Sequence, residues 1–337
     1  METLYRYNLP ENLIAKKPAS PRDSSRLLIY EVAKDKITID IFKNIAKYLP
    51  KNSALVMNES KVLPVRLKCY QAGNEDLELL VLLGECDKYI LKGIVSRRLH
   101  NGDEIFIAPD LKLKVLDASY KVYKFEANFP MKDLEKILKR YGTTPIPKYI
   151  EHENLSEDFL RKKYQTVFAK NPGSAAAPTA SLHFTPRVFK SLERAGIEHN
   201  FVTLHVGLGT FAPVLPEHRE SGKFYEETYE IPSSTLKNIE GKNVVAVGTT
   251  VVRTLETYGK TRVPAGKSDL FIQQYFKFRM VDTLITNFHL PGSSLMMLVE
   301  AFLHSKGSKR HLKEIYEFAI SEKFRFYSFG DSMLILP

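Results

Sequence analysis

The chain carries five short apolar runs in succession: LELLVLLG (77–84), YILKGIVS (89–96), EIFIAP (104–109), LKLKVLDA (111–118) and YKVYKFEA (120–127). Turn sequences separate them, such as Ala72-Gly73-Asn74 before the first run and Asn101-Gly102-Asp103 before the third. Short alternating strands divided by regular turns are typical of antiparallel sheets and barrels. The sequence therefore predicts a small antiparallel β-barrel, which we assign to residues 66–148.

On both sides of this stretch, strand patterns alternate with helix patterns. The expected strands are two around a turn at 33–36, followed by 53–57, 201–206, 244–247 and 284–287. The expected helices lie after residue 42, at 131–141, 156–169 and 186–195, after residue 250, and after Ser293 or Ser294. Such alternation favours a layered α/β fold. We therefore expect one discontinuous α/β domain, residues 1–65 and 149–337, with the β-barrel inserted in it.

The composition is that of a soluble globular protein. Of the 337 residues, 44% are hydrophobic and 26% are charged, which excludes fibrous and wholly disordered chains. Cys69 and Cys86 have no metal-ligand spacing, so we expect neither a disulfide framework nor a metal centre. No stretch is long and apolar enough to cross a bilayer, and no signal peptide is visible. We expect a cytoplasmic protein.

The net charge is positive. Lys plus Arg number 49 and Asp plus Glu 39, giving +10, which is compatible with a polyanionic partner such as nucleic acid. The excess is spread along the chain. One basic cluster, at 306–313, could contact a nucleic-acid backbone. We favour the alternative that these residues are exposed to solvent at the start of a helix.

Two polar loops rich in small residues follow in the second half of the chain. In α/β folds, such loops lie where sheets bind ligands. The first loop, 171–185, includes Ser174 and Thr179 and ends near His183; the alternative is a flexible connector. The second, 203–211, contains a GxG but no third glycine, so it is not a dinucleotide fingerprint. His205 in this loop is either catalytic or a satisfied core histidine.

A third loop and a fourth have the same setting. The third, 247–256, joins a strand to the start of a helix and could bind a carboxylate or phosphate there. Its candidate residues are Gly248, Thr249, Thr250 and Arg253. The alternative is an ordinary capped helix with a solvated arginine. The fourth loop, 282–293, places Asn287 and His289 between a strand end and a helix start.

Three histidines in three such loops favour proton transfer over metal coordination, because none has metal-ligand spacing. The sequence contains no GxxxxGK[ST], GxSxG or HExxH motif. These absences disfavour P-loop NTPases, α/β-hydrolases and zinc proteases.

Further motifs accompany the four loops in order along the chain. They are 7–10 (YNLP), 22–27 (RDSSRL), 58–67 (NESKVLPVRL), 164–169 (YQTVFA) and 324–331 (FRFYSFGD). Together they closely resemble the S-adenosylmethionine:tRNA ribosyltransferase-isomerase family of queuosine biosynthesis, nearly from end to end. The resemblance implies an α/β domain with an inserted β-barrel, in agreement with the strand pattern.

The resemblance also implies a reaction. The ribosyl part of S-adenosylmethionine is transferred to the aminomethyl group of a 7-deazaguanine at the tRNA wobble position and isomerised. Epoxyqueuosine forms, and adenine and methionine leave. S-adenosylmethionine is then a consumed substrate, and no cofactor is implied. The expected partner is a tRNA with a GUN-type anticodon, and we expect no membrane association and a monomer.

Candidate roles follow from this chemistry, which removes a proton beside a sulfonium and protonates departing adenine. His183, His205 and His289 are expected to transfer protons, and Asp282 and Asp331 to orient a histidine or steady a cation. Residues expected to contact substrate are Arg253, Thr249, Thr250, Gly248, Asn58, Arg66, Ser174, Thr179, Asn287 and Glu227. Asn58 and Arg66 are expected at the domain junction.

Four departures from the family pattern stand out. Ser181 replaces a usual glycine and Val251 a usual serine, and the segments 218–227 and 273–276 differ more strongly. They motivate one alternative, a non-catalytic relative that binds tRNA or a nucleoside. A methyltransferase is a weaker alternative, because the glycine-rich nucleotide turn is missing.

Overall fold

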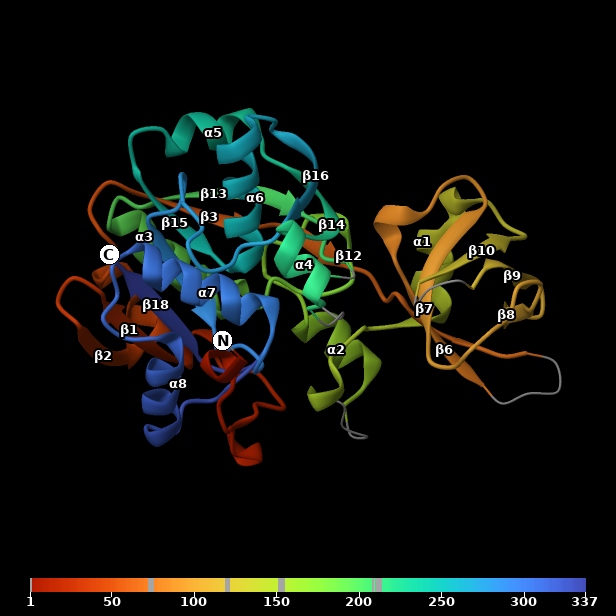
Figure 1. Ribbon diagram of the computed structural model, residues 1–337, viewed down its shortest axis with the longest axis horizontal. Helices are drawn as coiled ribbons and strands as arrows, with labels where there is room; N and C mark the ends of the chain where they lie inside the picture. Colours follow the sequence, from red (N-terminus) through yellow and green to blue (C-terminus); the bar gives the residue numbers. More distant parts are fainter. Residues whose placement is uncertain (1, 72–75, 119–121, 151–154, 208, 210–213) are drawn as a thin grey trace.

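A computed structural model describes residues 2–71, 76–118, 122–150, 155–207, 209 and 214–337. The chain forms a larger α/β body and a smaller β body beside it (Figure 1). The expected turn at 72–74 and the start of the last apolar run, 120–121, lie outside the described residues. So do residues 208, 210 and 211 of the second polar loop.

A nine-stranded mixed sheet forms the centre of the larger body. Its strands, in spatial order, are β16 (Ala265–Leu270), β14 (Lys223–Glu230), β13 (Glu198–Leu204), β3 (Ser53–Asn58), β15 (Asn243–Val247), β17 (Thr283–Asn287), β18 (Ser332–Leu336), β1 (Arg26–Glu31) and β2 (Lys36–Ile41). The four strands β13, β3, β15 and β17 are parallel, whereas β18 runs antiparallel to β17 and parallel to β1.

This topology brings distant segments to one edge of the sheet. The carboxyl ends of β13, β3, β15 and β17 meet there, and β18 and β1 begin at the same edge, because Asn287 pairs with Ser332 and Ser332 with Leu27. Ligands of α/β proteins bind outside the carboxyl ends of parallel strands. The sheet therefore positions the polar loops together.

Alternating side chains cover both faces of the sheet. In β1, Leu28 and Tyr30 face one core, whereas Leu27 and Ile29 face the other. The first core is packed by α6 (Thr249–Thr261), α7 (Ser294–Ser305) and α8 (Leu312–Ser321), and the second by α3 (Pro186–Arg194) and the 3₁₀ helix η4 (Phe42–Lys47). The larger body also contains α2 (Glu157–Lys163), α4 (Pro216–Ser221), α5 (Ser233–Ile239) and several 3₁₀ helices, among them η8 (Thr179–His183).

The smaller body is a curled seven-stranded antiparallel sheet around its own core. Its strands, in order, are β11 (Gly142–Thr143), β5 (Arg66–Cys69), β6 (Leu77–Val81), β7 (Ile90–Val95), β10 (Tyr123–Ala127), β9 (Leu111–Asp117) and β8 (Glu104–Ala108), with helix α1 (Leu134–Tyr141). Tyr70, just after β5, exchanges backbone hydrogen bonds of 3.0 and 2.8 Å with Phe106 of β8. This bridge joins the two ends of the sheet, and the predicted fold class is confirmed.

One expected helix is shorter than its pattern. Ser156 caps α2 by accepting from the Phe159 N–H, as expected, but the helix ends at Lys163 instead of Ala169. The Gln165 side chain hydrogen-bonds both backbone groups of Val62 at 3.1 and 2.7 Å, drawing the chain toward β4 (Ser60–Val62). The next segment, β12 (Asn171–Ser174), pairs with β4, so the first polar loop begins as a strand.

No helix in the described ranges is long and apolar enough to cross a membrane.

Candidate active site

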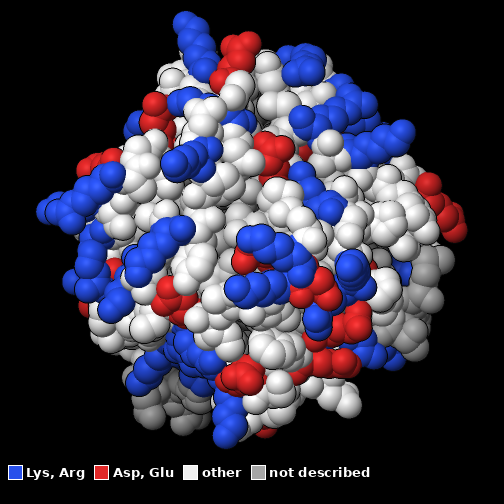
Figure 2. Space-filling model, turned by 90° about the vertical axis from the view of Figure 1, so that its left-hand side faces the viewer, with Lys and Arg blue, Asp and Glu red and all other residues white. Residues whose placement is uncertain are grey.

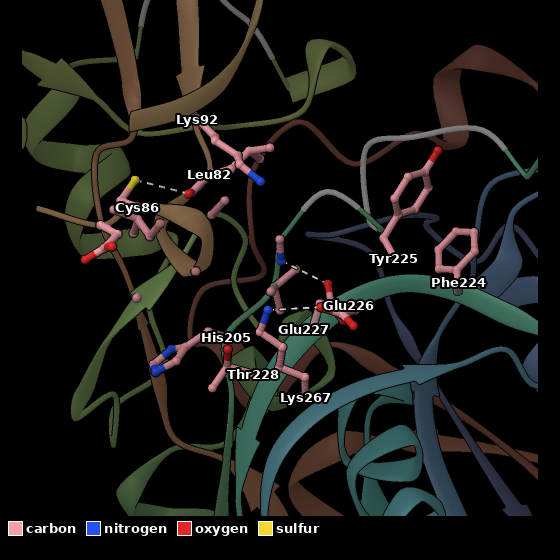
Figure 3. Close-up of a pocket in the computed structure, with 17 residues that line it drawn as sticks. Leu82, Cys86, Lys92, His205, Phe224, Tyr225, Glu226, Glu227, Thr228 and Lys267 are labelled. Carbon is pink, nitrogen blue, oxygen red and sulfur yellow. Dashed lines mark hydrogen bonds and ion pairs between the residues drawn. The ribbon is translucent and has the colours of Figure 1, made fainter. Parts of the chain in front are cut away.

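A cavity of about 630 Å³ lies between the two bodies. The barrel side contributes residues 82–84, Cys86, Asp87 and Lys92, and the α/β side contributes Gly173, Ala175, residues 205–207, 224–228 and Lys267. Figure 3 shows these side chains around the space. Its volume is within the range of pockets that bind small ligands. The junction of the bodies is therefore the candidate site.

His205 lines this cavity directly after β13. Its backbone N–H donates to the Thr228 carbonyl at 2.9 Å, while its buried Nδ1 has no hydrogen-bond partner. Burial lowers the pKa of His205, against an opposing effect from Glu230, so the ring is neutral at pH 7. A neutral imidazole with a free nitrogen can accept a proton.

Gly173 on β12 makes room for this ring. Its φ of +149° is in the region that favours glycine, and a Cβ there would lie 2.6 Å from Nδ1 of His205. The glycine of the first loop thus fixes the position of the histidine of the second loop.

Glu227, on the floor of the cavity, is 3% exposed and forms an ion pair with Arg253. Its other oxygen, Oε1, accepts from the Gly207 N–H at 2.9 Å. Arg253 also donates to the carbonyls of Leu270 and Ser268 at 3.2 and 3.3 Å. Arg253 was expected to hold a substrate anion, but its guanidinium is fully engaged by protein groups.

Charged and aromatic side chains complete the cavity lining. Glu226 pairs with Lys267 at 3.0 Å across β14 and β16, and both are drawn in Figure 3. Phe224 and Tyr225 lie at one end, and Asp87 and Lys92 come from the barrel side. Carboxylates and aromatic faces suit a cationic ligand group, and lysines suit an anionic one.

His183, at the end of η8, is 4% exposed and lies further along the sheet edge. Its Nδ1 is 2.8 Å from Oγ of Ser25. Burial lowers the pKa of His183 to about 4, and the nearby Asp331 charge opposes this effect. The ring is therefore neutral at physiological pH.

His289 follows β17 and is 8% exposed. Its Nε2 is 2.8 Å from Oγ1 of Thr286, and its N–H donates to the Tyr316 hydroxyl at 2.9 Å. Tyr7 donates to its carbonyl. Burial lowers the pKa of His289 to about 4.

The structure brings all three histidines to the same sheet edge but not to one point. His205 follows β13 and His289 follows β17, and these strands are three positions apart in the sheet. At the usual strand spacing this separation is about 14 Å. Of the three, His205 alone lines the cavity between the bodies. The positions of His205 and His289 are therefore well separated along this edge.

Several buried polar groups along this edge lack hydrogen-bond partners in the described part of the chain. They include Oγ of Ser181, Oγ1 of Thr250 and Oγ of Ser332. The side chains of His183 and Asn287 interact with each other, which opposes the lowering of the His183 pKa. Buried polar atoms are normally satisfied, and unpaired ones call for a specific explanation. A polar ligand reaching this edge would supply that explanation.

The third loop starts α6 as expected. Gly248 has a φ of +90° and its N–H donates to Ile285 at 2.8 Å, which turns the chain from β15 into the helix. Thr249 and Thr250 form the first turn. An exposed or ligand-facing helix start of this kind suits an anionic group.

Four candidates hold the site together instead of lining the cavity. Asn58 bonds both backbone groups of Leu204 at 2.9 and 3.1 Å, just before His205. Ser174 accepts from the Val206 N–H at 3.0 Å. Arg66 donates to the Ile146 carbonyl at 2.8 Å, at the crossing between the bodies. Thr179 begins η8.

The two candidate aspartates lie at opposite edges of the sheet. Asp331 is 1% exposed, accepts from the N–H groups of Arg26 and Arg325 at 3.0 and 2.8 Å, and lies near His183. Asp282 precedes β17 and accepts from the Val244 N–H at 2.9 Å. The structure separates Asp282 from the three histidines by the length of the strand, because they lie at its other end.

Sequence reasoning missed Asp87, Lys92, Tyr225 and Lys267 as cavity residues. Lys92 and Asp87 reach the cavity through the docking of the barrel, which no local pattern reports. No group of three or more His, Cys, Asp or Glu side chains that could hold a metal occurs among the described residues.

The fold and the cavity define a two-body α/β protein with a candidate site between the sheet edge and the smaller β body. Residues 2–335 match the family described as queuosine biosynthesis protein. A Rubrobacter xylanophilus relative named S-adenosylmethionine:tRNA ribosyltransferase-isomerase is 42% identical, over 98% of this chain and 96% of its own. The Thermotoga maritima protein of that name is 41% identical over 98% of both chains. The chain therefore belongs to the queuosine biosynthesis protein family.

The same arrangement occurs in a solved relative. The crystal structure of S-adenosylmethionine tRNA ribosyltransferase from Thermotoga maritima matches this chain with a TM-score of 0.55 and 32% identity. The match covers 99% of this chain and 100% of that one.

Proposed function

We propose that this enzyme is an S-adenosylmethionine:tRNA ribosyltransferase-isomerase. It transfers the ribosyl group of S-adenosylmethionine to 7-aminomethyl-7-deazaguanine at the wobble position of tRNA and isomerises it. The products are epoxyqueuosine-tRNA, adenine and methionine. The observation that carries the proposal is the cavity between the bodies, where a neutral His205 lies among carboxylates and aromatic rings in a chain 42% identical to an enzyme of this name.

His205 is the proposed base. Proton removal beside the sulfonium needs a neutral group with a free lone pair, and the neutral ring of His205 lines the cavity wall. Glu226 and Asp87 lie close enough to the same space to stabilise a cation by charge. Lys92 and Lys267 are the proposed contacts of the methionine carboxylate or a tRNA phosphate.

His183 and His289 are proposed to serve the far end of the site. Their neutral rings lie along the same sheet edge as Ser181 and Thr250, whose buried hydroxyls have no partner in the described structure. Adenine, which offers ring nitrogens and an amino group, suits that set of donors and acceptors. Asp331 is proposed as a positioning residue for His183.

The remaining expectations extend the proposal. Residues 66–148 form the inserted domain, which supplies one wall of the cavity. The tRNA carries a GUN-type anticodon, S-adenosylmethionine is consumed, and no cofactor takes part. The enzyme acts as a cytoplasmic monomer.

The test is release of adenine from S-adenosylmethionine in the presence of tRNA that bears the aminomethyl-deazaguanine. Wild-type enzyme is expected to release one adenine per tRNA modified, and tRNA with guanine at the wobble position is the control. The H205N variant is expected to lose about 10²–10⁴-fold in rate. Tight binding of both substrates without adenine release would support the non-catalytic alternative and reject the proposal.

A further inference from the structure

A second cavity, of about 480 Å³, is lined by residues of η4 and α3. Helix α3 lies on the side of the larger body away from the barrel (Figure 1). We call this cavity the α3 groove. Its polar lining consists of Lys43 and Asn44 from η4, and Arg187, Lys190, Ser191 and Arg194 from α3. Figure 2 shows the molecule from this side, with Lys and Arg side chains over much of the face and acidic side chains between them.

The basic side chains of α3 share one face of the helix. Arg187, Lys190 and Arg194 are spaced at i, i+3 and i+7, which places them in a row. The opposite face carries Val188 and Leu192, both 0% exposed, which pack with Phe42 of η4. The apolar face therefore fixes the helix, and the row of cations is turned to solvent.

Most of this positive charge is uncompensated. Arg187 pairs with Asp23 at 2.5 Å. Lys43, Lys190 and Arg194 have no carboxylate within 4.0 Å among the residues that the structure describes. The basic cluster at 306–313 differs, since Arg310 pairs with Asp35 at 2.6 Å and His311 with Glu300 at 2.6 Å. Two cations of that cluster are therefore held by carboxylates, whereas Lys43, Lys190 and Arg194 of the α3 groove have none in the described structure.

The α3 groove is attached to the candidate site by short connections. Asp23 accepts from Thr185 at 2.6 Å and from Arg187, and Ser25, two residues on, contacts His183 at 2.8 Å. The segments 23–25 and 183–187 thus belong both to the groove and to the sheet edge. A ligand held in the groove is positioned rigidly relative to that edge.

We propose that the α3 groove binds the sugar–phosphate backbone of the tRNA substrate. This inference rests on the proposed function and adds a docking surface to it. Arg187 and Arg194 are seven residues apart, or about 10 Å along the helix axis. A row of that length suits successive phosphates of a nucleic-acid strand better than one small anion. Exposed Lys and Arg side chains that neutralise phosphates release counterions and give salt-dependent affinity.

The test compares two double charge reversals of equal size. K190E/R194E changes the α3 groove, and K237E/K260E changes exposed lysines on α5 and α6 that have no ion-pair partner in the described structure. The affinity for unmodified tRNA is measured for both and for wild type by fluorescence anisotropy at several salt concentrations. K190E/R194E is expected to weaken binding at least 10-fold relative to the control. Its slope of log K against log salt should become shallower by about 1.4–1.8, for two lost phosphate contacts.

Calorimetry with S-adenosylmethionine and melting temperatures separate this effect from damage to the fold. Both should match wild type in K190E/R194E, and K190Q/R194Q should show a smaller loss of tRNA affinity. Equal tRNA affinities of K190E/R194E and the control would overturn the groove proposal while leaving the proposed function intact. Failure of the wild-type enzyme to bind tRNA at all would overturn both.

Discussion

The ring of His205 occupies the space that a side chain at Gly173 would take. A Cβ on Gly173 would lie 2.6, 2.7 and 2.9 Å from three atoms of this ring. Gly173 belongs to β12, and His205 follows β13, so the contact joins two segments that the sequence separates by a helix and a strand. The small residue in the first loop is therefore part of the catalytic geometry that we propose.

The G173A variant should displace His205 from the cavity. Alanine at a φ of +149° also carries backbone strain, about 1–3 kcal/mol in total. We expect kcat/KM to fall at least about 10-fold, since each 1.36 kcal/mol of barrier is tenfold in rate. G196A is the matched control, because Gly196 has a φ of +70° with nothing within 4 Å. It should lose stability but keep its activity. Equal activities of the two variants would contradict the role of Gly173.

The E227Q variant should destabilise the protein and slow the reaction. It leaves the Arg253 guanidinium, 11% exposed, without its counterion, and breaking a buried pair costs about 3–5 kcal/mol. Urea unfolding measures this loss. E226Q is the control, because the Glu226–Lys267 pair is 59% and 56% exposed and worth at most about 1 kcal/mol. Similar unfolding midpoints for E227Q and E226Q would show that the Arg253–Glu227 pair is not structural.

The D282N variant should retain nearly full activity. Asp282 lies at the end of β17 opposite His289, and its carboxylate accepts from the Val244 N–H. Asparagine keeps an acceptor there, so the stability loss should stay within about 1 kcal/mol. Adenine release by D282N within about twofold of wild type is the expected result, and H205N is the inactive comparison. A large loss of rate in D282N would contradict this prediction and show that Asp282 takes part in the reaction.

Stability should fall as the pH drops from about 6.5 to about 4. Burial lowers the pKa values of His183 and His289 to about 4 in the folded protein, below the ordinary value of 6.5. In this window the unfolded chain binds protons that the folded protein does not, so unfolding is favoured as pH falls. Each histidine contributes about 1.4 kcal/mol per pH unit. Above pH 6.5 this contribution is constant.

Urea unfolding at pH 7, 6 and 5 measures this dependence. The H289Q variant, which removes one of the two groups, should flatten the slope in this window by about 1.4 kcal/mol per pH unit. An unchanged slope in H289Q would mean that His289 is protonated equally in the folded and unfolded states.

The fold class could be predicted because the two kinds of pattern are local. Alternation in the runs between 77 and 127 marks the barrel, and buried runs such as 244–247 mark the parallel strands. The end of α2 could not be predicted, since it depends on the long-range hydrogen bonds between Gln165 and Val62. The helical sequence pattern continues past Lys163, but the hydrogen bonds to Val62 end the helix there.

The site residues could be predicted only where they lie at the carboxyl ends of strands. His205 and Gly248 directly follow two parallel strands and Asn287 ends a third, so topology alone gathers them. Asp282 is close to Asn287 in sequence, but five residues of extended chain separate them by about 16 Å. Lys92 and Asp87 belong to the other body, and their position depends on docking. Local patterns contain no information about that.

The chain crosses into the barrel and out of it at neighbouring strands, because Leu67 of β5 pairs with Gly142 of β11. A short peptide could bridge these two points without disturbing any strand of the larger sheet. A protein shortened in this way would keep His205 but would leave its ring exposed to solvent on one side. The insertion supplies the second wall of the cavity, and in the reaction that we propose this wall would shield a sugar intermediate from water.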